Sequence, residues 1–246
     1  MKRNGSRAGF NCAAGRYTSG ISPVGLLLVI LISGCGIETL PYLEAPTITG
    51  SQPFPNLQHS TLNALDEFVG YDFYYRFFSN SEAFQPNAVN TNLAGESSLV
   101  AQGYRRMLAR VKPDGETPGS TLLTPPILRI PDVLRGIQLS FQIELPDGIL
   151  QAEPQIIPPP EHAAQLDALF LMRNVGTPAS PEPLSFLEPF SAADQNDLSA
   201  EGISTVASID QITIAIYAIA VGYDLTSFAP IRSAPVFGGL TTFIPN

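Results

Sequence analysis

The sequence has no tryptophan, only two cysteines and only two histidines in 246 residues. Two cysteines exclude a disulfide-rich scaffold, and two histidines leave little for a histidine-based metal cage. Positive charge is also scarce, because 13 Lys and Arg stand against 22 Asp and Glu, for a net charge of −9. A chain this acidic is a poor partner for nucleic acid. The apolar fraction of 44% is nevertheless enough for a hydrophobic core, which excludes wholesale disorder.

The common catalytic motifs are missing as well. The sequence contains no Gly-x-Ser-x-Gly elbow, no His-Glu-x-x-His, no phosphate-binding glycine-rich loop and no Cys-x-x-Cys. Glu161, His162 and Asp167 could form an acid–base group, but no nucleophile accompanies them, so a surface histidine is the simpler interpretation. His59 lies in a polar stretch that is typical of a solvated loop. We therefore predict no catalytic, cofactor-binding or metal-binding residues.

Two clusters of charged residues remain as candidate sites. Four oxygen-bearing side chains fall within eight positions: Asp194, Asn196, Asp197 and Glu201. Leu198 occupies the third ligand position of the calcium-loop pattern, which favours a solvated acidic loop. The basic cluster outside the N-terminal region consists of Arg105, Arg106, Arg110 and Lys112. It could meet an anionic partner, or it could neutralise the protein's own carboxylates.

Residues 1–34 have the physical pattern of a secretory signal peptide. Lys2, Arg3, Arg7 and Arg16 accompany no acidic residue, and an apolar run follows at residues 25–32. This run is too short to span a bilayer, because a membrane-spanning helix needs about 20 apolar residues. A basic region followed by a short apolar core is instead typical of a signal peptide.

The apolar run ends in Ile32-Ser33-Gly34-Cys35, which resembles the lipobox of bacterial lipoproteins. In that family the cysteine thiol is diacylglycerated, the chain is cut before the cysteine, and the new amino terminus is usually acylated. The resemblance implies lipid attachment at Cys35 and membrane contact through acyl chains, since two or three chains anchor stably. Gly36 stands where an Asp often signals inner-membrane retention in diderm bacteria, so the resemblance implies the outer membrane.

Cleavage before Cys35 changes the charge of the chain. It removes four basic residues and no acidic one, which leaves 9 basic and 22 acidic residues and a net charge of −13. Such a surface repels anionic lipid headgroups, so membrane contact should come from the acyl chains. Cys12 is lost with the signal peptide, and the mature chain then has no pair of cysteines for a disulfide.

After the signal peptide we expect a proline-rich tether over residues 35–57 and one β domain over residues 58–246. Proline-rich segments are extended and semi-rigid, although a first edge strand of the domain explains residues 36–57 equally well. Prolines throughout roughly 80–205 predict insertions or further strands in place of long helices. Short helices are expected at 97–111 and 161–172. Gly103 favours a break in the first of these, with a strand from Tyr104 as the alternative.

Four segments have the pattern of strands. Residues 69–78 alternate two sets of side chains, with Val69, Tyr71, Phe73, Tyr75 and Phe77 on one face and Asp72, Tyr74, Arg76 and Phe78 on the other. Residues 137–145 alternate apolar and polar side chains, which predicts one buried face. Residues 211–223 are apolar on both faces, as in a central strand. Residues 224–230 then form a turn, and 233–237 a short edge strand.

Two of these regions resemble known modules. Residues 69–78 resemble the central Gly-Tyr-x-x-Tyr-Tyr-Arg strand of fibronectin type III domains. The order of long strand, turn and Ser-x-Pro-Val strand resembles the end of a fibronectin type III or immunoglobulin-like sandwich. The resemblance implies a mainly β, immunoglobulin-like or fibronectin type III-like sandwich with long proline-rich insertions and one or two short helices.

The whole chain resembles small lipoproteins of diderm bacteria, including those of spirochaetes. It combines a lipobox, a proline-rich tether, an aromatic strand and an acidic domain. We expect a lipid-anchored protein of the cell envelope that acts as a non-enzymatic interaction or structural module with a protein partner. A small-ligand or lipid carrier is the first alternative, and would need an apolar cavity. An envelope hydrolase is the second, and would need carboxylates or a Ser/His pair converging in a cleft.

Overall fold

The computed structural model places the described residues in one compact unit, Pro41–Asn246. The described residues are 42–50, 55–78, 95–112, 122–145, 148–149, 152–177, 179–190 and 212–244. The predicted signal peptide, Cys35 and the acidic cluster at 194–201 lie outside these residues.

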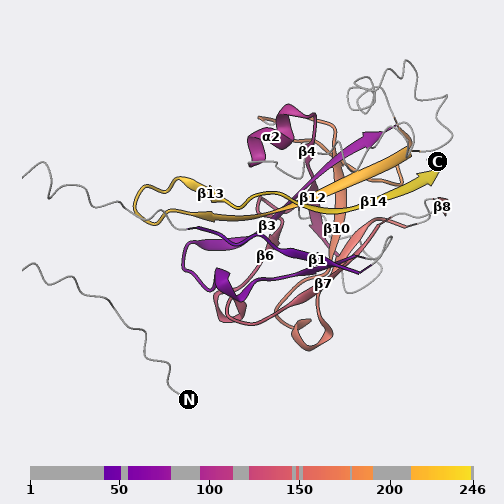
Figure 1. The fold of residues 1–246 in the computed structure, drawn as a ribbon. Coiled ribbons are helices and arrows are strands. Elements are labelled where there is room, and N and C mark those ends of the chain that lie inside the picture. The colour runs from indigo at the N-terminus through magenta and orange to yellow at the C-terminus, as the bar shows by residue number, and fades with distance from the viewer. Residues whose placement is uncertain are drawn as a thin grey trace, which may run out of the picture. The chain divides into compact units, whose positions relative to one another are not determined.

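The unit is a mainly β structure built from two sheets of seven strands each (Figure 1). In the order in which its strands pair, sheet I contains β1 (Thr47–Thr49), β2 (Asn56–Gln58), β7 (Ser140–Glu144), β9 (Gln155–Ile157), β10 (Leu169–Asn174) and β11 (Pro183–Leu184), with β5 (Leu108–Val111) also on β10. All of its strand pairs are antiparallel.

Sheet II is built around two long strands. Its order is β4 (Arg105–Arg106), β3 (Phe68–Phe78), β12 (Ile212–Tyr223), β14 (Val236–Ile244) and β8 (Gly148–Ile149), with β13 (Pro230–Arg232) on β12 and β6 (Leu128–Arg129) on β3. All pairs are antiparallel except β8 with β14. The α-helix of the described residues is α2 (Glu96–Ala101), and 3-10 turns occupy Thr61–Asn63, Asp132–Leu134 and Pro160–His162.

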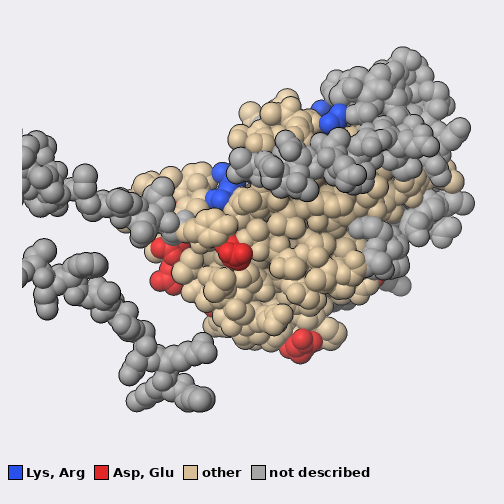
Figure 2. Space-filling model, viewed as in Figure 1, with Lys and Arg blue, Asp and Glu red and all other residues tan. Residues whose placement is uncertain are grey.

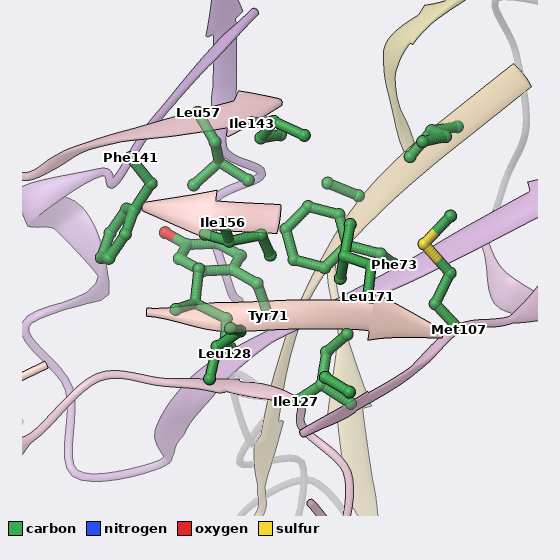
Figure 3. Packing of buried hydrophobic residues seen from close by; sticks show 14 of the residues in the cluster. Leu57, Tyr71, Phe73, Met107, Ile127, Leu128, Phe141, Ile143, Ile156 and Leu171 are labelled. Carbon is green, nitrogen blue, oxygen red and sulfur yellow. The ribbon is translucent and has the colours of Figure 1, made fainter. Parts of the chain in front are cut away.

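Strands β3 and β12 are each buried on both faces. One face of each strand packs in an inner cluster, and the other face packs in an outer cluster. An inner cluster between the sheets takes the odd-numbered aromatics of β3, the even-numbered apolar residues of β12, and apolar residues of sheet I such as Phe141, Ile156 and Leu171 (Figure 3). An outer cluster takes Tyr74, Phe78, Leu99, Tyr104, Ala215, Tyr217 and Ile219. The alternation predicted for 69–78 is therefore confirmed from Tyr71 to Phe78, and the two-sided burial predicted for 211–223 is confirmed from Ile212 to Gly222.

A bulge changes one detail of this alternation. Gly70 pairs with Val221 and Phe68 pairs with Gly222, so Val69 is an extra residue on β3. The extra residue reverses the alternation, and Phe68 enters the inner cluster in place of Val69. In β7 the predicted alternation holds from Leu139 to Leu145, whereas Ile137 precedes the strand and is exposed.

Three predictions of secondary structure differ from the structure. Residues 161–172 form a single 3-10 turn followed by β10, because Leu169 and Leu171 pair with β5 across the sheet. The helix predicted over 97–111 ends at Ala101, and Gly103, with φ of +83°, leads into β4, which is the alternative given above. The short strand predicted at 233–237 is instead β14, nine residues long from Val236.

The remaining described segments join the sheets as further strands. Residues 47–49 and 56–58, within the segment interpreted as tether or edge strand, form β1 and β2 of sheet I. Within roughly 80–205, β4 to β11 contribute to both sheets. The chain passes from sheet II to sheet I at Met107, whose N–H donates to the carbonyl of Phe73 at 2.8 Å and whose side chain is fully buried. The two sheets are thus the layers of a sandwich.

Candidate functional site: a charged pocket beside helix α2

A pocket of about 460 Å³ lies beside α2, where strand β4 approaches the end of β10. Its walls come from segments far apart in the sequence. The lining includes Tyr74 of β3, Glu96 and Val100 of α2, Arg105 and Arg106 of β4 with the preceding Tyr104, and Asn174 of β10. A volume of this size is in the range of small-molecule sites.

The turn after α2 shapes one wall of the pocket. Leu99 is fully buried in the outer cluster and fixes the helix on sheet II. The carbonyl of Leu99 accepts the N–H of Tyr104 at 3.0 Å, which closes the turn through the left-handed Gly103. Tyr104 then packs edge-on against Tyr217 of β12, with ring centroids 5.1 Å apart. Arg76 donates to the carbonyl of Gln102 at 2.8 Å and secures the same turn.

Glu96 is held by two groups from the outer face of sheet II. The hydroxyl of Tyr74 donates a hydrogen bond to Oε1 of Glu96, and Nε of Arg232 lies 2.8 Å from Oε2. Burial raises the pKa of Tyr74, and the neighbouring carboxylate raises it further, so the phenol stays a hydrogen-bond donor. The charge of Glu96 is therefore compensated from within the protein.

Arg106 faces a buried carboxylate. Tyr74 and Arg106 are opposite each other in the β3–β4 register, and Asp72 is on the same face of β3, with 1% of its surface exposed. Oδ1 of Asp72 accepts the N–H of Ile127 at 3.1 Å, and Oδ2 lies 3.8 Å from Nη1 of Arg106. Burial raises the pKa of Asp72, although Arg106 opposes the shift. Among the described residues, Oδ2 has no hydrogen-bond partner.

Arg105 connects the β4 side of the pocket with the end of β10. Its Nη1 donates to the carbonyl of Asn174 at 3.1 Å. The hydroxyl of Tyr75, from the inner face of β3, accepts the N–H of Asn174 at 3.0 Å. These bonds hold the end of β10 beside the edge of sheet II, so the pocket is bounded by structured backbone on both sides.

The predicted basic cluster is divided between different places. Arg105 and Arg106 line the pocket, Arg110 lies 3.7 Å from Oε1 of Glu153, and Lys112 donates to Gln155 at 2.9 Å. The cluster thus neutralises two of the protein's own carboxylates, Asp72 and Glu153. This is the second of the two roles that the sequence allowed for it, the first being contact with an anionic partner. Charged side chains are sparse on the face shown in Figure 2.

The prediction of a solvated loop for His59 is wrong. The ring is 2% exposed, Nδ1 lies 2.6 Å from the hydroxyl of Tyr71, and Nε2 lies 2.8 Å from the carbonyl of Arg135. Tyr71 of β3 and Arg135 are 12 and 76 residues away in the chain, so the local sequence does not reveal these contacts. His162 stays near the surface, 3.2 Å from Oε1 of Gln165, as expected.

Sequence reasoning missed the acidic member of the pocket and a buried arginine. Glu96 has no neighbouring charge in the sequence that would single it out. Arg173 is fully buried, donates to the carbonyls of Ser185 and Glu188 at 2.7 Å, and lies over the ring of Phe190 at 4.3 Å. Its role is to fix the 185–190 segment, because backbone carbonyls are its acceptors. The aromatic residues of β3 and the basic pair Arg105 and Arg106 were the signals for the pocket that the sequence offered.

Comparison of the chain with protein-family models, with curated proteins and with solved structures found no match. Within the described residues, His, Cys, Asp and Glu form no group of three that could hold a metal ion. No helix in that part of the chain is both long and apolar enough to cross a membrane.

Proposed function

We propose that the protein is a lipid-anchored component of the cell envelope, in which the β-sandwich acts as a non-enzymatic interaction or structural module. The observation that carries the proposal is the sequence Ile32-Ser33-Gly34-Cys35 directly behind a short apolar run and a basic N-terminal region. The lipid would be attached at Cys35, and Gly36 favours the outer membrane over the inner one.

The start of the fold sets how far such a module would stand from a bilayer. Leu43 is fully buried, and the N–H of Glu44 donates to Oδ1 of Asn63 at 2.7 Å, so the chain is fixed to the sandwich from this point. Only residues 36–42 separate Cys35 from Leu43, and fully extended they span at most about 25 Å. The module would therefore be held next to the headgroups.

The hairpin between β12 and β13 supports an interaction role. Its tip exposes Leu225 and Phe228, at 54% and 78% of their surface, and Tyr223 at its base is 41% exposed. Figure 1 shows this hairpin extending away from the sandwich. Large apolar side chains grouped at an exposed tip are typical of a contact surface.

The lipid anchor is tested by replacing its cysteine. In a diderm host, the wild-type chain should sediment with membranes and have the mass of residues 35–246 plus acyl groups. Cys35→Ala should keep residues 1–34 and lack acyl groups, because the acyl acceptor is gone. Cys12→Ala is the matched control and should behave as wild type. A Cys35→Ala chain that is still cut and still sediments with membranes would overturn the anchor.

The interaction role is tested at the hairpin tip. A photo-crosslinking amino acid at position 228 should give a discrete higher-mass product in whole cells. The same group at position 62, where Leu62 is 71% exposed in the 3-10 turn Thr61–Asn63, is the control and should give none. Absence of a product at 228, or equal products at both positions, would contradict a contact at the tip.

A small-ligand-binding role is a second candidate. The observation that favours it is the pocket of about 460 Å³ with both apolar and charged walls. Calorimetric titration of the protein with small aromatic acids and alcohols tests this role, and no heat of binding at millimolar concentration would contradict it.

A further inference from the structure

The hairpin between β12 and β13 begins where the N-terminal part of the chain joins the sandwich. Leu43 is fully buried and lies over Gly222 near the end of β12, since a Cβ atom added at Gly222 would be 3.2 Å from Cδ1 of Leu43. The next residue of the hairpin, Tyr223, is fixed at the same place, because its N–H donates to the carbonyl of Glu67 at 2.9 Å. Residues 36–42 are therefore attached to the fold at the base of this hairpin.

The apolar tip of the hairpin lies close to this attachment point. Leu225 is three residues beyond Gly222, a backbone distance of at most about 10 Å. The chain from Cys35 to Leu43 spans at most about 25 Å when it is fully extended. Because this connecting chain is longer than the tip is tall, an anchor at Cys35 leaves the tip free to reach the headgroups of the same membrane.

The exposed side chains change in character from the base of the hairpin to its tip. Tyr42 precedes Leu43 and Tyr223 follows Gly222, and both tyrosines are exposed, as are Leu225 and Phe228 nearer the tip. Tyrosine is enriched at the boundary between water and hydrocarbon, because its ring is apolar and its hydroxyl can stay hydrated. Tyrosines at the base and purely apolar side chains at the tip match the order of headgroups and acyl chains in a bilayer.

The polar groups of the turn are bonded within the turn itself. Oδ1 of Asp224 accepts the N–H of Thr226 at 2.7 Å and the N–H of Ser227 at 3.0 Å. The carbonyl of Asp224 accepts the N–H of Phe228 at 2.8 Å. Moving backbone groups out of water is costly where they have no partner, so these bonds lower the cost of placing the tip among lipids. Asp224 is the only charged residue of 223–230, and its negative charge favours zwitterionic over anionic headgroups.

We propose that Leu225 and Phe228 insert into the zwitterionic leaflet that carries the acyl chains of Cys35, so that the sandwich rests on the membrane through this hairpin. The inference rests on the proposed lipid anchor and names the partner of the contact surface at the tip. A bilayer is favoured over a protein partner because the tip lies beside the point where the anchored chain joins the fold. The product of cross-linking at position 228 is then a phospholipid adduct.

The absence of tryptophan from the sequence makes the tip directly observable. Phe228→Trp gives the chain a single tryptophan at the tip, and Ile244→Trp gives a matched control at the opposite end of sheet II (Figure 1). Ile244 is 42% exposed and follows Phe243, which pairs with Ile212 at the far end of β12. Each full chain is produced in a diderm host, its acylation is measured by mass, and it is reconstituted into phosphatidylcholine vesicles with or without brominated acyl chains.

Bromine quenches tryptophan only at close range, so the emission reports contact with the acyl chains. The Phe228→Trp chain should lose about half or more of its emission in brominated vesicles, because the tip lies at the boundary of headgroups and acyl chains. The Ile244→Trp chain should keep its emission. An acylated Phe228→Trp chain that is not quenched would overturn the lipid contact and leave the anchor standing, also where its emission shifts to shorter wavelength through burial against protein. A chain without acyl groups would overturn the anchor and this contact together.

A second variant tests whether the apolar character of the tip places it in the membrane. In the Phe228→Trp chain, Leu225→Asp should remove most of the quenching, because a carboxylate resists transfer out of water. Ile244→Asp makes the same change at an exposed residue far from the tip and should leave the quenching unchanged. Circular dichroism checks that both variants are folded. Unchanged quenching in Leu225→Asp, or an equal loss in Ile244→Asp, would overturn insertion of the tip.

Discussion

The imidazole of His59 is fixed between two partners that determine its tautomer. The carbonyl of Arg135 can only accept, so Nε2 carries the hydrogen, and Nδ1 accepts from the hydroxyl of Tyr71. Burial, the largest effect, lowers the pKa of His59 below its usual 6.5. The ring therefore stays neutral in the folded protein.

This burial predicts a loss of stability in mild acid. In the unfolded chain His59 takes up a proton as the pH falls below about 6.5, whereas the folded protein resists it. The free energy of unfolding should fall between pH 7 and pH 5, by up to about 1.4 kcal/mol per pH unit. Urea unfolding of wild type and His59→Gln measures the difference, with His162→Gln as the control. Equal pH slopes in wild type and His59→Gln would contradict the assignment.

Asp72 should change the free energy of unfolding with pH in the direction opposite to His59. Its pKa is raised by burial, so its contribution to stability is complete below the unfolded value of 3.8 and is lost as the pH rises through the folded value. Asp72→Asn keeps an oxygen for the N–H of Ile127 and removes the buried charge. Relative to wild type, Asp72→Asn should therefore gain about 1 kcal/mol or more of stability between pH 4 and pH 8. A constant difference across that range would refute the role of the charge.

Which polar side chains are buried could not be predicted from the sequence. Asp72 was expected on the second face of its strand, and it is there, but its partner Ile127 is 55 residues away. His59 and Arg135 are separated by 76 residues. A local pattern shows which face a side chain is on, whereas burial depends on what covers that face.

Strands β3 and β6 approach so closely that Gly70 has no room for a side chain. A Cβ atom there would lie 2.1 Å from the carbonyl oxygen of Leu128, which is backbone and cannot rotate away. Gly70→Ala should therefore cost about 2–3 kcal/mol of unfolding free energy.

The control for Gly70→Ala is Gly136→Ala. The nearest atom to a Cβ at Gly136 is Cβ of Ala64 at 3.9 Å, an ordinary contact, so this change should cost less than about 0.5 kcal/mol. Chemical denaturation of both variants provides the comparison. A Gly70→Ala protein as stable as Gly136→Ala would show that β6 can move away.

The β12–β13 hairpin contains a strained residue. Phe228 has φ of +57°, a left-handed conformation that is costly for a bulky side chain. Its ring is 78% exposed, so Phe228→Asn loses little burial and relieves strain. We expect a gain of about 0.5–1 kcal/mol in unfolding free energy. Leu225→Asn, from the same hairpin and 54% exposed, should stay within about 0.5 kcal/mol of wild type. A loss of stability in Phe228→Asn would show that the ring packs.

The elements with a strong local pattern were predicted, and those chosen by pairing were not. β3, β7 and β12 carry enough aromatic or apolar alternation to define them without their neighbours. Residues 161–172 carry apolar side chains at helical spacing. Leu169 to Met172 nevertheless form a strand, because their backbone pairs with β5 in sheet I. The hydroxyl of Ser233 accepts the N–H of Ala220 at 2.9 Å, in the place of a backbone carbonyl. Strand β14 therefore begins only at Val236.

The two sheets share one core, and this predicts a single unfolding transition. The inner cluster contains side chains of both sheets, and Met107 links them where the chain crosses. Far-UV circular dichroism and tyrosine fluorescence should give coincident curves in urea. Met107→Ala should lower both midpoints together, through a loss of about 2–4 kcal/mol. Separate transitions, or an effect on one probe alone, would indicate two independent units.

At the level of the molecule, the sequence predicts a two-layer β fold but not the pocket. Arg105 and Arg106 attracted attention as a basic pair, and Tyr74 as part of an aromatic strand. They meet Glu96 and Asn174 only because α2 packs on the outer face and β10 ends beside β4. The site is thus a product of topology, which a one-dimensional pattern cannot supply.

The pairing of β3 with β12 also governs when the molecule can form. The ladder joins residues 68–78 to residues 213–222, so residues 79–212 must be synthesised before its first bond can form. Pairing across such a separation is slow, because closing the chain into a large loop costs conformational entropy before any stabilising contact forms. A nascent chain that cannot complete its central sheet stays open while it is being made. A secretion channel accepts only an unfolded chain, so under the export proposed above the same topology that delays folding would keep the polypeptide open until it has passed through the channel.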